Sequence, residues 1–179
     1  MRKLTMPELG RKTTEEFKES EKIPVTVVLD NVRSMHNVGS IFRTADAFLI
    51  EKICLCGYTP QPPHRDIHKT ALGATETVAW EYYSTTTACI VALKEKGYQI
   101  FSVEQVEGSL SLDLISLENL NGPLAVVLGN EVEGVQDDIL KLSDAAIEIP
   151  QFGTKHSLNV SVAAGIVLYR LCALIKKGA

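Results

Sequence analysis

Continuous apolar runs alternate along this chain with segments of helical periodicity, and this alternation constrains the fold more than any other feature. The runs with strand character are residues 25–29, 53–56, 99–103, 124–128 and 146–149. The segments with helical spacing are residues 37–48, 85–96, 134–142 and 157–176. Strands that are apolar throughout, without polar alternation, are typical of a parallel sheet covered on both faces. The sequence therefore predicts an α/β domain with a mostly parallel sheet and helices on both faces.

The first 24 residues differ from the rest because they hold six basic and five acidic residues and no strand-like run. We expect residues 1–24 to form a charged, helical extension and residues 25–179 to form the domain itself. No linker, repeat or low-complexity tract divides the chain further.

No segment has the character of a leader or a membrane span. The N-terminus is charged rather than apolar, and the stretch from Leu158 to Ile175 is interrupted by Asn159 and Arg170. The four cysteines lack the spacing of a disulfide framework. We therefore expect a cytoplasmic protein with reduced thiols and no membrane partner.

A zinc site is the metal reading that the sequence allows. Cys54 and Cys56, followed by His64 and His68, supply suitable ligand types. One intervening residue is too few for a usual zinc knuckle, and residues 52–57 look like a buried strand in which cysteine acts as a small hydrophobe. We accordingly predict no metal.

The charge is unevenly distributed. The chain has 18 Lys and Arg against 22 Asp and Glu, a net charge of −4, which excludes a uniformly basic binder of nucleic acid. Residues 104–148 hold ten acidic residues and one basic residue, whereas residues 31–75 hold five basic and three acidic ones. The distribution permits an RNA on the basic side with the acidic segments turned away, few phosphate contacts and a shallow salt dependence of binding.

The usual fingerprints of nucleotide or acyl chemistry are missing. The chain has no G-x-G-x-x-G after its first strand, no P-loop and no G-x-S-x-G elbow. Ligands of parallel sheets bind beyond the carboxyl ends of strands, and three polar segments lie there, at residues 30–44, 128–134 and 149–159.

Each segment also has a simpler explanation. Asn37 is a good helix N-cap, Glu131 suits a solvated loop, and His156 suits an exposed one. Asp30, at a strand end, fits the phosphorylated position of a flavodoxin-like regulator, although the accompanying acidic cluster is missing.

Taken together, the three segments resemble a known family. N-x-G-x-x-x-R at residues 37–43, G-N-E-x-x-G at 129–134 and I-P-x-x-G-x-x-x-S-L-N-V-S-V-A at 149–163 are similar to the three motifs of the SpoU-type branch of the SPOUT methyltransferases. The resemblance extends from about Val25 to Lys176. The third motif departs from many relatives at residues 151–152 and 155–156, which leaves the substrate open.

The resemblance implies a sheet whose C-terminal segment forms a deep trefoil knot, a feature that periodicity would not predict. In that family the knot binds S-adenosylmethionine and two subunits complete the site. The residues expected to bind the cofactor, largely through backbone groups, are Leu128, Gly129, Ile149, Pro150, Gln151 and Leu158.

The implied reaction is methylation of a ribose 2′-hydroxyl in RNA, with transfer RNA preferred over ribosomal RNA. Arg43 matches the catalytic arginine; gripping a phosphate in a bidentate way suits its guanidinium, whereas a role as proton acceptor does not suit so poor a base. The supporting catalytic positions are Asn37, Glu131, Ser157 and Asn159. The residues expected to contact RNA are Arg33, His36, Arg65, Lys69, Lys155 and His156.

The last helix is apolar over most of its circumference and needs partners on more than one side, which predicts a homodimer. Three other functions stay open: the same reaction on ribosomal RNA, a non-catalytic RNA-binding protein with the knotted fold, and a methyltransferase for a small molecule or a protein.

Overall fold

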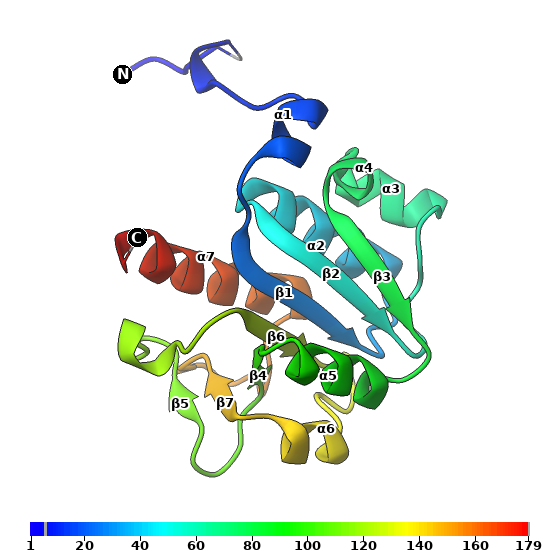
Figure 1. The fold of residues 1–179 in the computed structure, drawn as a ribbon, viewed down its shortest axis with the longest axis vertical. Helices are drawn as coiled ribbons and strands as arrows, with labels where there is room; N and C mark the ends of the chain where they lie inside the picture. Colours follow the sequence, from blue (N-terminus) through cyan, green and yellow to red (C-terminus); the bar gives the residue numbers. More distant parts are fainter. Residues whose placement is uncertain (6, 179) are drawn as a thin grey trace.

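The computed structural model describes residues 1–5 and 7–178 and is built around one twisted sheet (Figure 1). Its seven strands lie in the order β3-β2-β1-β6-β4-β7-β5, and every neighbouring pair is parallel. The strands are β1 (Ile23–Asp30), β2 (Ile50–Cys56), β3 (Ala79–Tyr83), β4 (Gln99–Val103), β5 (Leu110–Ser111), β6 (Leu124–Leu128) and β7 (Ala145–Glu148). The predicted parallel α/β architecture is confirmed.

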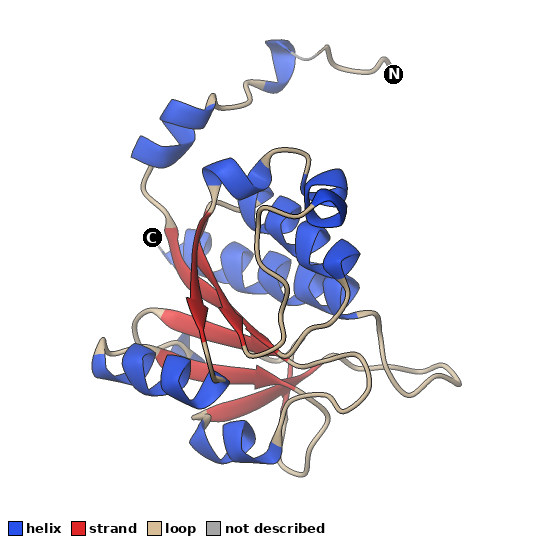
Figure 2. Ribbon diagram, turned by 90° about the vertical axis from the view of Figure 1, so that its right-hand side faces the viewer, coloured by secondary structure: helices blue, strands red, loops and turns tan. Residues whose placement is uncertain are grey.

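Helices cover both faces of this sheet (Figure 2). The helices are α1 (Thr14–Glu19), α2 (Met35–Ala47), α3 (Arg65–Ala71), α4 (Ala74–Thr77), α5 (Thr86–Glu95), α6 (Asp137–Leu142) and α7 (Val160–Gly178), with 3-10 turns at Pro7–Leu9 and Leu117–Asn119. Side chains of a strand alternate between faces. Val27 and Leu29 of β1 therefore join the core formed with α2 and α7, while Val28 joins the core formed with α5 and α6.

Two strands escaped the sequence prediction for physical reasons. β3 is an edge strand, and three of its five residues are exposed, so it contains no continuous apolar run. β5 is two residues long and pairs with β7 at the opposite edge. Both extend the sheet, and neither changes its parallel character.

Three predicted helix starts are wrong. The helix expected from residue 37 begins at Met35, because the Ser34 hydroxyl accepts a hydrogen bond from the Asn37 backbone N–H at 3.3 Å and caps the helix. Asn37 is therefore not the cap. The helices expected from residues 134 and 157 begin at Asp137 and Val160, so the loops before them are longer than predicted.

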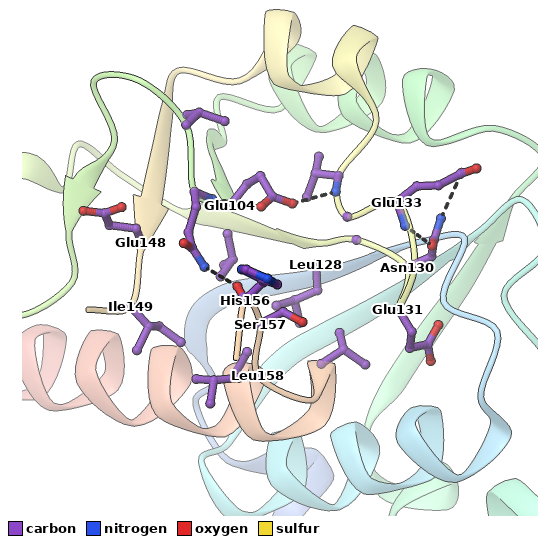
Figure 3. A pocket seen from close by; sticks show the side chains of 18 of the residues that line it. Glu104, Leu128, Asn130, Glu131, Glu133, Glu148, Ile149, His156, Ser157 and Leu158 are labelled. Carbon is purple, nitrogen blue, oxygen red and sulfur yellow. Dashed lines mark hydrogen bonds between the residues drawn. The ribbon is translucent and has the colours of Figure 1, made fainter. Parts of the chain in front are cut away.

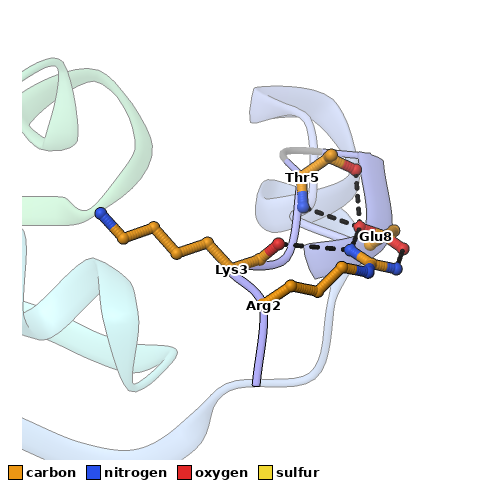
Figure 4. Close-up of polar contacts among 4 residues, drawn as sticks. All are labelled: Arg2, Lys3, Thr5 and Glu8. Atoms are coloured by element: carbon orange, nitrogen blue, oxygen red, sulfur yellow. Dashed lines mark hydrogen bonds and ion pairs between the residues drawn. The ribbon is translucent and has the colours of Figure 1, made fainter.

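Residues 1–5 and 7–20 extend away from the sheet, and among these described residues α-helix is confined to residues 14–19 (Figures 1 and 2). Phe17 is buried and anchors this segment to the body of the protein. Farther out, Arg2 donates to the Glu8 carboxylate at 2.6 Å, and the Thr5 backbone N–H donates to it at 2.7 Å (Figure 4). The Arg2 contact, helped by Thr5, lowers the pKa of Glu8 to about 2.

Candidate active site

A hydrogen-bond network joins the three motif segments at one edge of the sheet. The Asn37 side chain donates from Nδ2 to Glu131 Oε1 at 2.9 Å and accepts at Oδ1 from Asn159 Nδ2 at 3.1 Å. Asn37 can make both contacts because its side chain is not used to cap α2. This single amide thus links two residues that lie 94 and 122 positions farther along the chain.

Glu131 also ties its loop to the turn after β1. Its carboxylate accepts from the backbone N–H groups of Arg33 and Ser34, both at 3.1 Å. Burial opposes ionisation of this carboxyl, but the hydrogen bonds from Arg33, Asn37 and Ser34 outweigh it and lower the pKa of Glu131. The carboxylate is therefore held ionised, which keeps its acceptor role available.

Asn159 occupies the N-terminus of the last helix. Its Oδ1 accepts from the backbone N–H of Ser161 at 2.9 Å, while its Nδ2 reaches Asn37. The oxygen of the Asn159 amide therefore stabilises the start of α7, and the nitrogen of the same amide joins the network. Ser157, two residues earlier, is exposed and faces the adjacent cavity.

A cavity of about 630 Å³ lies beside the network, between the loop after β6 and the segment after β7 (Figure 3). This volume is within the range of small-molecule sites. Its apolar lining includes Val103, Leu128, Ile147, Ile149 and Leu158. Its acidic lining is contributed by Glu104, Glu131, Glu133, Asp137 and Glu148.

The loop after β6 is tightly folded against itself. Asn130 and Gly134 exchange two backbone hydrogen bonds of 3.1 Å, and Gly134 has a positive φ of 71°. A Cβ on Gly129 would lie 2.0 Å from the Gly134 carbonyl carbon, so only glycine fits there. The glycines of the second motif are therefore needed for this turn rather than for generic flexibility.

Two carboxylates behind the loop hold it in place. The buried Asp30 accepts from the Gln136 backbone N–H at 3.1 Å and from the Thr86 hydroxyl at 2.6 Å. Glu104 accepts from the Val135 backbone N–H at 3.0 Å. Asp30 thus has a structural role in this fold, in contrast to the phosphorylation site of the regulator alternative.

Arg43 stands apart from the cavity. It is exposed on α2, six residues beyond Asn37, or about 9 Å along the helix axis. Among the described residues no hydrogen bond or ion pair involves its guanidinium. His36 lies seven residues before it, so the two side chains share one exposed stripe of α2. The catalytic assignment of Arg43 stays a prediction.

The other predicted residues divide between two places. Of the predicted cofactor residues, the cavity lining includes Leu128, Gly129, Ile149, Gln151 and Leu158 but not Pro150. Of the predicted RNA-binding residues, His156 lines this cavity, and Arg33, His36 and Lys155 are exposed near the motif segments. Arg65 and Lys69 lie on α3.

Sequence reasoning missed the residues contributed by the end of β4. Glu104 and Gln105 line the cavity, and Gln105 Nε2 donates to the His156 carbonyl at 3.0 Å, which supports the third motif. Their position directly after a strand would have identified them, because ligands gather at that edge. Part of the acidic segment is also nearer the site than expected, since five of its ten carboxylates line the cavity.

Cys54 and Cys56 lie buried in β2, as the strand interpretation predicted, and contribute to the core formed with α5. The contact with the neighbouring Cys89 and, after it, burial raise the pKa of the Cys54 thiol. Within residues 1–5 and 7–178, no group of three or more His, Cys, Asp or Glu side chains could hold a metal ion. In the same part of the chain, no helix is long and apolar enough to cross a membrane.

Comparison with known proteins gives the site a context. The model of the SpoU rRNA Methylase family matches residues 24–169. The chain is 31% identical over 162 residues to a tRNA (guanosine(18)-2′-O)-methyltransferase of Thermus thermophilus, covering 90% of this chain and 81% of that protein. It is also 31% identical over 162 residues to the 23S rRNA (guanosine-2′-O-)-methyltransferase RlmB of Vibrio parahaemolyticus, covering 90% of this chain and 64% of that longer protein.

Solved structures agree in fold. The Aquifex aeolicus TrmH/SpoU tRNA modifying enzyme superposes with a TM-score of 0.79 at 27% identity, covering 92% of this chain and 81% of that one. An AdoMet-bound rRNA methyltransferase of Sinorhizobium meliloti gives 0.77 at 29% identity, covering 84% and 56%. These neighbours imply the α/β knot fold. The matched motifs and the matched fold together place this chain in the SpoU rRNA methylase family.

Proposed function

We propose that this protein transfers a methyl group from S-adenosylmethionine to a ribose 2′-hydroxyl of RNA, and that its substrate is a transfer RNA. The observation that carries the proposal is the Asn37–Glu131–Asn159 network, which brings three separate motifs to the rim of one cavity. A structural role alone would not require these polar groups to meet at a cavity of ligand size.

The cavity fits this cofactor in shape and charge. Leu128, Ile149 and Leu158 offer apolar surfaces for an adenine, and the loops on either side offer backbone N–H and C=O groups. The surrounding carboxylates favour a ligand with sulfonium and ammonium charges. When bound, S-adenosylmethionine supplies the electrophilic methyl group.

The residues outside the cavity act on the RNA. Arg43, exposed and unpaired among the described residues, is free to grip the phosphate beside the target ribose with two parallel hydrogen bonds. This grip orients the 2′-oxygen toward the cavity. Asn37 and Glu131 hold the start of α2, and with it Arg43, at a fixed position relative to the cavity.

The comparisons support RNA as the substrate class, because the chain is 31% identical both to the Thermus tRNA enzyme and to the Vibrio rRNA enzyme. We prefer transfer RNA because a chain with a net charge of −4 and a limited set of exposed cations near the motif segments suits a compact, free RNA. Ribosomal RNA is the second candidate, because the identity to the Vibrio rRNA enzyme is the same as that to the Thermus tRNA enzyme. Methylation of purified tRNA and rRNA fractions, with mass spectrometry of the digested nucleosides, separates the two.

A homodimer completes the proposal. One face of α7 is buried in the chain, and the other face exposes an apolar stripe made of Val162, Ile166 and Tyr169. The third-motif loop before it is exposed as well, with Phe152 at 96%. A second copy would remove this apolar surface from water and cover the mouth of the cavity.

Replacement of Arg43 tests the reaction. Arg43→Ala should lower methyl transfer from radiolabelled cofactor at least about 100-fold, while calorimetry shows unchanged affinity for S-adenosylhomocysteine. Lys96→Ala, an exposed cation at the end of α5 on the other face of the sheet, is the control. If Arg43→Ala turns over as fast as wild type, the catalytic role of Arg43 is refuted. If the wild-type protein binds no S-adenosylhomocysteine, the proposed methyltransferase activity is refuted.

A further inference from the structure

A second cavity, of about 510 Å³, lies between α3, α4 and the edge strand β3. It is lined by separate residues from those of the first cavity. Its lining includes Pro62, Pro63, His64, Arg65, Glu76 and Trp80.

Much of the lining of this second cavity is apolar. Trp80 is half-buried on β3 and packs on one side against the main core, so its ring is held in place. Pro62 and Pro63 contribute rigid rings from the loop before α3. An aromatic ring that lines a cavity together with apolar rings offers a surface on which an unpaired nucleobase can stack, and each such contact contributes about 1–3 kcal/mol.

The polar groups around these walls are not used within the protein. Among the described residues, the Arg65 guanidinium, the Glu76 carboxylate and the Trp80 indole N–H have no hydrogen-bond partner, and Arg65 and Glu76 do not pair with each other. His64 accepts at Nδ1 from the Asp66 backbone N–H at 3.2 Å, so its Nε2 carries the proton of the neutral ring and is a donor. These groups supply donors, and the Glu76 carboxylate supplies an acceptor.

That set of groups matches guanine better than a pyrimidine. The O6 and N7 atoms of guanine accept from arginine in a bidentate way, and its N1–H and N2–H groups suit a carboxylate. Uracil has the smaller stacking surface and lacks both the O6/N7 pair and the exocyclic amino group. Arg65 and Glu76 therefore supply the two kinds of polar group that the two edges of guanine need.

The second cavity is also rigidly connected to the proposed reaction site. A Cβ on Gly39 of α2 would lie 2.1 Å from Thr70 Oγ1 and 2.3 Å from the Ile67 carbonyl of α3, so the two helices approach at backbone distance. Thr70 Oγ1 also donates to the His36 carbonyl at 3.1 Å, next to Asn37. A base held here would fix the RNA relative to α2.

We propose that this cavity binds an unpaired guanine base of the RNA substrate, distinct from the nucleotide that is methylated. The proposal rests on the proposed function, since it assigns a second contact to the same RNA. Arg65 and Glu76 select the base, Trp80 stacks on it, and Lys69 on the exposed side of α3 attracts its phosphates.

Trp80 is the single tryptophan of the chain, so its fluorescence reports on this cavity directly. Titration with guanosine 5′-monophosphate should quench it saturably, and uridine 5′-monophosphate should bind at least about fivefold more weakly. Because both carry the same phosphate, the difference isolates the base. Arg65→Ala and Glu76→Gln should weaken the guanosine nucleotide about 5- to 100-fold. Glu95→Gln on α5 is the matched control and should change nothing.

The RNA measurement separates this proposal from the proposed function. Arg65→Ala, Glu76→Gln and the conservative Trp80→Phe should raise the KM for RNA with little change in kcat and no change in affinity for S-adenosylhomocysteine. Equal quenching by both nucleotides, or unchanged KM in all three variants, overturns the guanine site. Guanosine-selective quenching in a protein that methylates no RNA would instead retain the base site and refute the proposed reaction.

Discussion

The second motif offers the sharpest test of the cofactor cavity, because one methyl group should disturb it. In Gly129→Ala the new Cβ would lie 2.0 Å from the Gly134 carbonyl carbon and 2.2 Å from the Val135 nitrogen. Ordinary contacts begin at 3.4 Å, so the loop backbone would have to move by about 1.4 Å. The atoms in the way are backbone atoms, which cannot turn aside as a side chain can.

The cost follows from what this shift breaks. Overpacking a rigid site costs about 1–3 kcal/mol, and the two hydrogen bonds between Asn130 and Gly134 would lengthen. A loss of about 1.4 kcal/mol in cofactor binding alone is a tenfold change. We therefore expect S-adenosylhomocysteine to bind Gly129→Ala at least about tenfold more weakly, with a fall in unfolding free energy of about 1–3 kcal/mol.

Gly153→Ala is the matched control, since a Cβ there meets nothing within 4 Å although the residue belongs to the third motif. Calorimetry with S-adenosylhomocysteine and urea unfolding should be run on both variants. If Gly129→Ala binds S-adenosylhomocysteine as tightly as Gly153→Ala and unfolds at the same urea concentration, the close packing of this loop is not what shapes the cavity.

Three further results are expected. Asp30→Ala leaves the Thr86 hydroxyl and the Gln136 N–H without their buried acceptor, so urea unfolding should show a loss of about 2–6 kcal/mol; a loss below 1 kcal/mol would contradict this. Ile166→Glu, on the exposed stripe of α7, should give a monomer in sedimentation without lowering the stability of the chain, and an unchanged dimer would count against that interface. The lowered pKa of Glu131 stabilises the fold above the unfolded carboxyl pKa of about 4.3, and this contribution disappears as pH falls through the lower folded value. Urea unfolding between pH 3 and 6 should show a smaller pH dependence in Glu131→Gln than in wild type; an identical dependence would exclude the contribution.

The central strands of the sheet could be predicted from the sequence, because a strand buried on both faces is apolar at nearly every position. Val25–Leu29 and Leu124–Leu128 are apolar at every or almost every position, and both became central parallel strands. Cys54 and Cys56 read correctly as strand residues for the same reason. Polar segments after those strands were also identified, since residues at the carboxyl edge of a sheet are free of the packing that keeps the strands apolar.

The contacts of the candidate site were beyond any local pattern. Asn37 looked like a helix cap, and only the folded chain shows that Ser34 takes that position and leaves the amide to join Glu131 to Asn159. The order of the strands brings these distant segments together, and periodicity carries no information on strand order. Arg43 lay within a matched motif, yet the helix carries it to an exposed face outside the cavity.

The edge of the sheet also separates what the sequence predicts from what only the folded chain shows. β3 is too exposed to be recognised from its residues, and the cavity around Trp80 exists only because α3 and α4 pack beside that strand. Local sequence thus indicated the buried strands and the longer helices, since burial acts on each residue separately. The partners of each polar side chain followed from the tertiary arrangement, because a hydrogen bond depends on where two distant segments meet.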